Sequence, residues 1–477
     1  MIEAITYHPD WIYEVKTKLG RKYDPKLIEK VIYALVFLEQ LKVNGLNFIF
    51  KGGTALLLAT KEPKRFSIDI DIITEHTQSE IESILETISK ETIFTHWEDD
   101  NNRKHSPDAP IGHFKMYYKS NVDGSVEPIL LDILYTPNPY PELMGLPIAH
   151  DWIKTTDAIT TVKMPTFDSI LGDKLTAFAP KTTGILYTKG RPVEIIKQLF
   201  DVAFLMDNIT DLEMVRNSYT KVVKEEIAFR KLKLSSDNVL EDTQEACYVL
   251  SIRDIKSEEF KHLQLGVSNF TNFTLTKFNI EEAITAAAKV AYLSEIIKNT
   301  EKTTIEKFDN PLEVKDWLIE EAQFNKLNKL KKSNPEAFFY WYKASLSFAP
   351  NDLVFSMNSA ILKDKNKVSP KKKSVGSNTF SSKEIKSLND AIYWQRARDG
   401  KFSDNDPLLS IKDKLNSNTK VVISNFSENE KSLILNTINK NISYLNNYKY
   451  IGLTEEQAIS NKQEILIPLF KLREKLK

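Results

Sequence analysis

The sequence predicts an α+β protein, in which an N-terminal α/β domain with a small mixed β-sheet flanked by helices precedes a mostly α-helical bundle domain. Three observations predict this class. A strand, a glycine turn, a short helix and a second strand follow one another between residues 47 and 75. Two further strand-like runs, 112–120 and 126–135, are joined by a hairpin signal. Beyond residue 207 the apolar side chains recur mainly at helical spacing.

Length and composition are compatible with two domains, which we place at residues 1–208 and 209–477. A hydrophobic fraction of 42% and a charged fraction of 27% are typical of a soluble globular protein. Because the formal net charge is zero, any nucleic-acid surface must be a local patch. Cys247 is the single cysteine, which excludes an intramolecular disulfide and indicates a reducing compartment. We expect its thiol to be buried as a small apolar group.

The chain shows no export or membrane signal. Its first residues lack the basic and apolar regions of a signal peptide, and no run reaches the roughly 18 apolar residues of a membrane span. We therefore expect a cytoplasmic protein with no membrane part and take a monomer as the default.

Helix caps mark the first predicted elements. Asp24 and Pro25 form an N-cap and first helical position, and apolar residues follow at helical spacing. Thr77 and Glu80 form a capping box for a second helix. Residues 98–110 are polar and predict a loop.

The segment between these helices carries a glycine turn. Residues 47–50 predict a short strand, which Gly52 and Gly53 interrupt. Glycines allow a sharp turn and a close approach of the backbone to a ligand. A short apolar helix over 54–59 follows, and the amides at its N-terminus suit phosphate oxygens.

Acidic residues alternate along the next predicted strand. Ser67, Asp69 and Asp71 are spaced by two and share one face; the other face carries Phe66, Ile68, Ile70 and Ile72. Neighbouring carboxylates repel each other unless a cation lies between them. Mg²⁺ is the expected cation, as two ions with Mn²⁺ as the alternative, because carboxylates and substrate phosphates complete its oxygen shell. Asp132 is the expected third carboxylate, since the hairpin through Asp123-Gly124 would lay it beside this strand.

Two later helices carry further charged residues. One follows Thr166 and contains Lys174; the other starts at Pro192 and places Lys197 and Asp201 four residues apart on one face. Lys174 is either a ligand-binding or a solvated lysine. For Asp201 an ion pair with Lys197 is the structural alternative to a role in the site.

The ordered motifs KGGTAL and RFSIDIDI resemble a known family. They look like the first motif of nucleotidyltransferases of the DNA polymerase β superfamily. Their form is close to the AbiEii/AbiGii branch, the nucleotidyltransferase toxins of type IV toxin–antitoxin and abortive-infection systems. The resemblance covers roughly the first two hundred residues. It implies transfer of a nucleoside monophosphate from an NTP to an acceptor hydroxyl, with tRNA as an acceptor and a separate protein as antitoxin.

The resemblance also implies roles for individual residues. Asp69, Asp71 and Asp132 would bind the metal ions and carry catalysis. The residues expected to bind the nucleotide are Lys51, Gly52, Gly53, Thr54, Arg65, Ser67, Lys174 and Asp201. In the family a lysine on the first of the two later helices contacts phosphates, and an acid on the second completes the site. The family often has Arg-Asp where this chain has Lys197-Gln198.

Two alternatives stay open at this point. One is a nucleotidyltransferase that modifies a small molecule or a protein, such as an antibiotic-modifying enzyme. The other is a non-catalytic NTP-binding or interaction module whose lysine-rich segment at 363–383 docks nucleic acid.

The C-terminal half is predicted to be mainly helical, with the lysine-rich segment 363–383 as a mobile linker or loop. The predicted helices are 211–232, 280–298, 311–332, 335–347, 383–397, 428–443 and 454–476, and residues 420–424 give the best strand signal. The aromatic run 338–342 either packs into a core or stacks on bases, and we expect the core. The spacing of the seven histidines predicts no zinc site.

Overall fold

The fold is taken from a computed structural model that describes residues 1–20, 22–103, 110–346 and 427–447, together with Leu388, Ile392 and Ile411. By its contacts the chain divides into two units, Met1–Ser356 and Met357–Lys477. The predicted boundary at residue 208 lies inside the first unit. Helices that follow this boundary therefore belong to the same compact body as the sheet.

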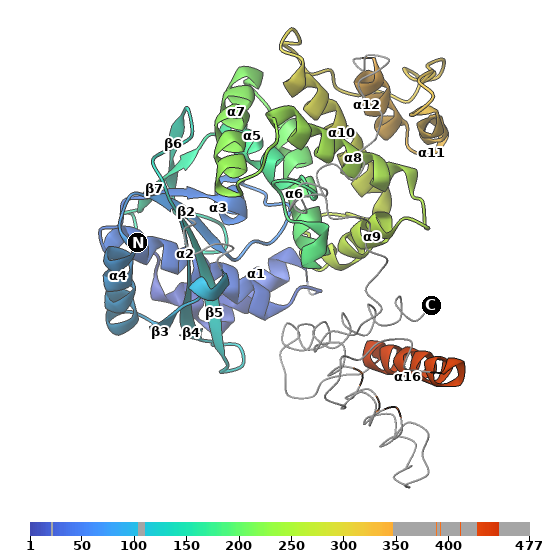
Figure 1. Ribbon diagram of the computed structural model, residues 1–477. Coiled ribbons are helices and arrows are strands. Elements are labelled where there is room, and N and C mark those ends of the chain that lie inside the picture. The colour runs from blue at the N-terminus through green and yellow to red at the C-terminus, as the bar shows by residue number, and fades with distance from the viewer. Residues whose placement is uncertain are drawn as a thin grey trace. The chain divides into compact units, whose positions relative to one another are not determined.

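The first unit is built around a mixed sheet of seven strands, in the order β3-β4-β5-β2-β1-β7-β6 (Figure 1). The strands are β1 Ile49–Lys51, β2 Ile70–Thr74, β3 Phe94–Asp99, β4 Ile111–Lys119, β5 Val126–Tyr135, β6 Leu143–Pro147 and β7 Thr161–Pro165. The pairs β2–β5 and β1–β7 are parallel, and the other neighbours are antiparallel. The predicted mixed sheet and its hairpin are confirmed; β3, β6 and β7 were not predicted.

Helices flank this sheet, as predicted. Those of the first two hundred residues are α1 Pro9–Leu19, α2 Pro25–Val43, α3 Gly52–Ala59, α4 Gln78–Glu91, α5 Phe167–Ala177 and α6 Pro192–Asp207. The predicted caps are present: the Asp24 side chain accepts from the amide of Lys26, and Thr77 and Glu80 close a capping box. The caps therefore fix where α2 and α4 begin.

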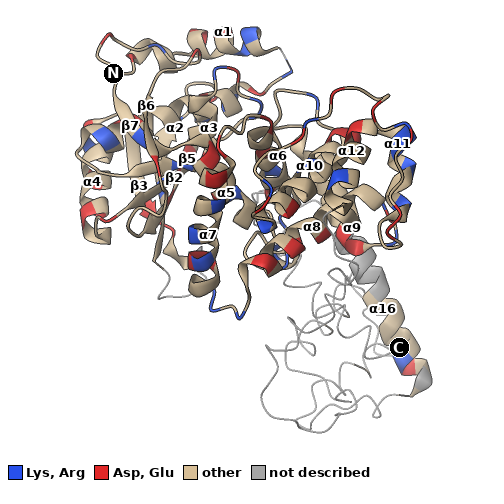
Figure 2. Cartoon of the chain, turned by 90° about the horizontal axis from the view of Figure 1, so that it is seen from above, with Lys and Arg blue, Asp and Glu red and all other residues tan. Residues whose placement is uncertain are grey.

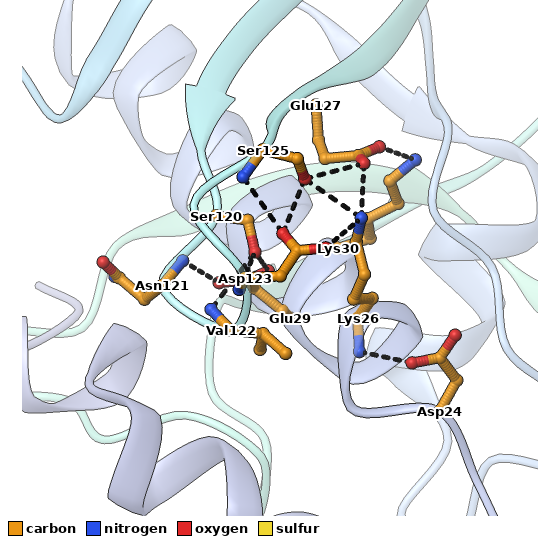
Figure 3. A network of polar contacts seen from close by, with 10 residues as sticks. All are labelled: Asp24, Lys26, Glu29, Lys30, Ser120, Asn121, Val122, Asp123, Ser125 and Glu127. Carbon is orange, nitrogen blue, oxygen red and sulfur yellow. Dashed lines mark hydrogen bonds and ion pairs between the residues drawn. The ribbon is translucent and has the colours of Figure 1, made fainter. Parts of the chain in front are cut away.

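A polar network fastens the turn of the β4–β5 hairpin to α2 (Figure 3). Lys26 lies 3.0 Å from Asp123 and 2.6 Å from Glu127. The buried Glu29 carboxylate accepts from the Ser120 hydroxyl at 2.6 Å. Because the turn is tied to the helix, the register of β5 against the rest of the sheet is held as well.

The helices from α7 to α12 belong to the same unit as the sheet, and the first four of them pack on α5 or α6. They are α7 Leu212–Phe229, α8 Ser236–Ile252, α9 Glu258–Phe270, α10 Ile280–Lys298, α11 Leu330–Ser333 and α12 Pro335–Ser345. Helix α7 contacts α5, whereas α9 and α10 contact α6. Cys247 is buried, and so are Phe338 and Trp341, which confirms the core interpretation of the aromatic run. The sequence did not predict α8 and α9.

The predicted helix over 311–332 is wrong. Apart from α11, the described backbone there forms turns and a short 3₁₀ helix, Asn325–Lys329. The Asn328 side chain accepts from the amide of Ile319 and donates to its carbonyl, both at 2.9 Å. These bonds satisfy backbone groups that a helix would otherwise pair, so apolar side chains are buried without helical geometry.

Of the second unit the structure describes mainly α16, Glu428–Asn447. This confirms the helix predicted at 428–443, and Ser427 caps it by accepting from the amide of Glu430. The helices predicted at 383–397 and 454–476, the strand at 420–424 and the lysine-rich segment 363–383 lie outside the continuous stretches that the structure describes.

Charge is spread evenly over the first unit. Figure 2 shows acidic and basic residues interspersed along its helices, in keeping with a net charge of zero. Over the described ranges, none of the helices combines the length and apolar character that crossing a membrane would need.

Candidate active site

Two of the predicted carboxylates lie side by side in the sheet. Asp71 on β2 pairs in register with Asp132 on the parallel strand β5. Side chains at paired positions of neighbouring strands point to the same face of the sheet. Asp69 precedes β2 by one residue, so of the three acidic and hydroxyl residues expected on one strand only Asp71 has strand geometry. The structure thus brings Asp132 beside Asp71, as the hairpin predicted.

The charge of this cluster is unfavourable without a cation. Burial, together with repulsion from the carboxylates of Asp132 and Asp69, raises the pKa of Asp71 to about 7, although Lys174 and Lys51 act to lower it. Within the described ranges, no group of three His, Cys, Asp or Glu side chains is close enough together to bind a metal ion in this conformation. The donor set nevertheless suits Mg²⁺, because it consists of hard carboxylate oxygens on two neighbouring strands and on the segment that leads into one of them.

His113 also reaches this cluster, and the sequence analysis missed it. It lies on β4 directly opposite Asp132, and its Nδ1 is 2.7 Å from Asp132 Oδ1. The sequence carried no clear signal for it, because the register of the hairpin decides which β4 residue faces Asp132, and the length of the turn sets that register.

The glycine turn is packed directly against the carboxylates. Gly52, the first residue of α3, directly follows β1 and has a positive φ of 77°, and a Cβ placed there would lie 2.0 Å from Asp71 Oδ2. A Cβ on Gly53 would lie 2.3 Å from Arg65 Nη2 and 2.6 Å from Ser67 Oγ. Only glycine leaves room for these contacts. The N-terminus of α3 therefore opens beside Asp71, Arg65 and Ser67.

Thr54 links this turn to the segment that leads into β2. Its buried hydroxyl donates to the backbone carbonyl of Asp69 at 2.6 Å. The bond joins the first turn of α3 to the segment that enters β2. The Thr54 hydroxyl thereby fixes the position of Asp69 relative to the glycine turn.

Asp201 holds two of the predicted basic residues. It accepts from Arg65 Nε and Nη2, both at 2.7 Å, and lies 3.0 Å from Lys174 Nζ. Burial would raise the pKa of Asp201, but the charges of Arg65 and Lys174 outweigh it and lower the pKa to about 2. Lys174 also donates to Gln198 at 2.8 Å. The alternative ion pair between Asp201 and Lys197 does not form, because Arg65 and Lys174 occupy the carboxylate.

Lys51 is also held by a carboxylate. Its Nζ lies 2.8 Å from Asp173 Oδ2, which also accepts from the Tyr140 hydroxyl at 2.6 Å. Burial alone would lower the pKa of Lys51, but the Asp173 charge raises it well above its ordinary value. Lys51 therefore stays positively charged near Asp71. Asp173 and Tyr140 are supporting residues that were not predicted.

Residues 37–310 match a family model described as the nucleotidyl transferase AbiEii toxin of the type IV toxin–antitoxin system. This match covers more than half of the chain and includes every predicted site residue. The chain belongs to this family. AbiEii membership makes the protein a nucleotidyltransferase of a toxin family. The match extends beyond the first two hundred residues into α10, so the AbiEii unit includes helices that we had assigned to a second domain.

Two solved structures are similar to this AbiEii protein over part of its length. The JHP933 protein of Helicobacter pylori is 14% identical, with a TM-score of 0.34, covering 58% of this chain and 93% of its own. A candidate nucleotidyltransferase from H. pylori is also 14% identical, with a TM-score of 0.31, covering 57% of this chain and 92% of its own. No curated protein matches the chain in sequence.

Proposed function

We propose that this AbiEii protein transfers a nucleoside monophosphate from an NTP to the hydroxyl of an RNA acceptor, with tRNA as the expected one. The observation that carries the proposal is the pairing of Asp71 with Asp132 beside the Gly52 turn. Carboxylates next to a helix N-terminus and a glycine turn are the groups that a metal-bound triphosphate requires.

Asp69, Asp71 and Asp132 are the proposed metal ligands. Two Mg²⁺ ions, or Mn²⁺ in their place, would supply the positive charge that offsets the phosphates and activates the acceptor hydroxyl. The backbone amides of Gly53 and Thr54 would bind phosphate oxygens at the N-terminus of α3.

The proposed reaction forms a bond between the acceptor oxygen and the α-phosphorus and breaks the bond from that phosphorus to the bridging oxygen. Pyrophosphate leaves with the bonding electron pair, and Asp132 takes the proton of the acceptor hydroxyl. Arg65 and Lys174 would offset the charge that develops on the leaving group. Asp201 holds both of these cations, so they need little reorganisation during the reaction.

We further propose that residues 1–208 carry the chemistry and that the later helices contribute to the choice of acceptor. As the family description implies, the toxin would have a cognate antitoxin, which we propose is a separate protein. The cytoplasm, where NTPs and tRNA occur together, is the proposed place of action.

Expression in a bacterial host tests the toxin role. We expect growth arrest with the wild type and none with Asp69→Ala/Asp71→Ala at matched protein levels. Arrest by both forms would separate toxicity from the carboxylate site and contradict the proposal.

Labelling with radioactive NTPs in the presence of total RNA tests the acceptor. We expect label in the tRNA fraction, dependent on Mg²⁺ or Mn²⁺. Label found only in protein or in small molecules would favour the alternative acceptors. Nucleotide binding without pyrophosphate release would favour a non-catalytic module.

A further inference from the structure

Three basic side chains at the site already form ion pairs with two carboxylates of the protein. Lys51 is paired with Asp173. Arg65 and Lys174 are both paired with Asp201. These ion pairs already offset part of the positive charge of the three side chains. An incoming triphosphate therefore brings more negative charge than the three can offset.

A fourth basic side chain, Lys197, has no such partner. It lies on α6 one turn before Asp201, and its Nζ is 4.9 Å from the centre of the Phe273 ring. Among the described residues, no carboxylate forms an ion pair with it. An aromatic ring supports an ammonium group through its electron-rich face but does not neutralise it. Within the part of the chain that the structure describes, Lys197 therefore lies on an aromatic ring without a salt-bridge partner of its own.

Arg65 and Asp69 are among the charged groups that act on Lys197. Burial and the neighbouring Arg65 guanidinium lower the pKa of Lys197, whereas the carboxylates of Asp69, Glu194 and Asp201 raise it. A partly buried cation without an anion at hydrogen-bonding distance is unfavourable for folding. An anionic ligand next to Asp69 and Arg65 would remove this cost.

Phe273 is held firmly at this position. The amide of Phe66 donates to the carbonyl of Phe273 at 2.8 Å, and the amide of Leu275 donates to the carbonyl of Lys64, also at 2.8 Å. The segment after α9 is thus joined to the segment that carries Arg65. The Phe273 ring is therefore held at a fixed position relative to Arg65, and so is the Lys197 ammonium group that lies on this ring.

We infer that Lys197 is a phosphate-binding residue that contacts the triphosphate of the incoming nucleotide. The inference rests on the proposed function, which it deepens by naming a further ligand-binding residue. Three N–H groups and a full charge would be available to non-bridging phosphate oxygens. In the alternative interpretation the methylene chain of Lys197 only packs on Phe273. The two interpretations differ in whether the charge of Lys197 contributes to phosphate binding.

Calorimetric titration tests this inference. The ligands are Mg²⁺-tripolyphosphate and the Mg²⁺ complexes of analogues of the four common NTPs in which the α,β linkage cannot be hydrolysed. Lys197→Met keeps the stem on Phe273 and removes the charge, whereas Lys197→Arg keeps the charge. Lys154→Met is the matched control, because Lys154 lies 4.4 Å from the centre of the Trp11 ring, away from the carboxylates. Nucleosides serve as ligands without phosphate.

The Met variant should bind tripolyphosphate and nucleotide about tenfold more weakly, the usual effect of losing one charged hydrogen bond. Its affinity for nucleosides should not change. Lys197→Arg and Lys154→Met should bind like the wild type. If the Met variant does not fold, Lys197→Gln replaces it in the comparison.

Two other outcomes would overturn the inference in different ways. Equal phosphate binding by wild type and Lys197→Met would refute the role of Lys197 and leave the proposed function standing. If Lys197→Met weakens the binding of nucleosides and nucleotides equally, Lys197 has a packing role only. A wild type that binds neither tripolyphosphate nor any NTP would refute the proposed function itself.

Discussion

His113 and Asp132 face each other across β4 and β5, with 2.7 Å between His113 Nδ1 and Asp132 Oδ1. The contact joins a carboxylate proposed to bind metal to a side chain outside the motifs that identify the family. A hydrogen bond of this kind fixes the orientation of the carboxylate, in the way that partners behind metal ligands commonly do.

Replacement of His113 should therefore impair catalysis without unfolding the protein. We expect His113→Ala to lower nucleotide transfer about 10- to 100-fold, since loss of such partners typically has effects of this size. His113→Asn should recover part of the rate, because its amide can donate from a similar position. His96→Ala, an exposed histidine on β3, is the control for initial-rate measurements. Wild-type rates in His113→Ala would contradict a positioning role.

Gly52 should tolerate no side chain. Its φ of 77° costs an alanine about 1–2 kcal/mol by itself. The added Cβ would also lie 2.0 Å from Asp71 Oδ2 and push that carboxylate aside. We expect Gly52→Ala to lower both the free energy of unfolding and the transfer rate.

Gly124 provides the matched control for this change. Its φ is also 77°, but a Cβ there would meet no atom within 4 Å. Chemical denaturation should show a smaller loss for Gly124→Ala, and its transfer rate should stay near the wild-type value. Equal losses in the two variants would mean that the contact with Asp71 is unimportant.

Asp201 should be important for stability as well as for activity. Asp201→Asn would leave Arg65 and Lys174 without a counter-charge in a buried place, and breaking such pairs costs about 3–5 kcal/mol. Denaturant titration should detect this loss. Glu213→Gln, at an exposed carboxylate 3.6 Å from the Arg216 guanidinium, should cost no more than about 1 kcal/mol. A similar cost in both variants would show that the buried pairs contribute little.

Asp242 should make stability depend on pH. Burial raises the pKa of this carboxyl from 3.8 to about 7, despite hydrogen bonds from Thr182 and the amide of Lys181. The folded protein thus keeps a proton that the unfolded chain releases. The free energy of unfolding should therefore fall as pH rises from about 4 to 7, by up to about 4 kcal/mol at 1.36 kcal/mol per pKa unit.

Asp242→Asn should remove this contribution and be more stable than the wild type above pH 7. Unfolding measured from pH 5 to 8 in both proteins isolates the effect, because other titrating groups are common to them. Asp237→Asn, at an exposed position of the same helix, is the control. Parallel pH profiles for wild type and Asp242→Asn would rule out Asp242 as the source.

The sequence alone predicted much of the framework around the site. The Asp24 cap, the capping box at Thr77 and the break at Gly52 depend on neighbouring residues, and each lies where it was expected. Hydrogen bonds over a few residues depend on side-chain type and spacing, which a sequence displays directly. The order of the motifs likewise indicated the family that the match over residues 37–310 confirms.

The register of the β4–β5 hairpin could not be predicted from the residues of its turn. A two-residue turn at Asp123-Gly124 would have paired Lys115 with Asp132. The turn is instead longer, closed by the amide of Ser120 donating to Ser125, and the shifted register brings His113 opposite Asp132. The contacts of this turn with α2 contribute to that choice, and they join residues far apart in the chain.

What the sequence determined is the set of charged residues, their order and the elements that carry them. The tertiary structure decided which charges neutralise each other: Asp201 pairs with Arg65 and Lys174, while Lys197 is left on the ring of Phe273. The physical reason is that ion pairs depend on distances of a few ångströms between distant segments. Such distances are fixed by packing of the sheet and helices, and spacing along the chain does not reveal them.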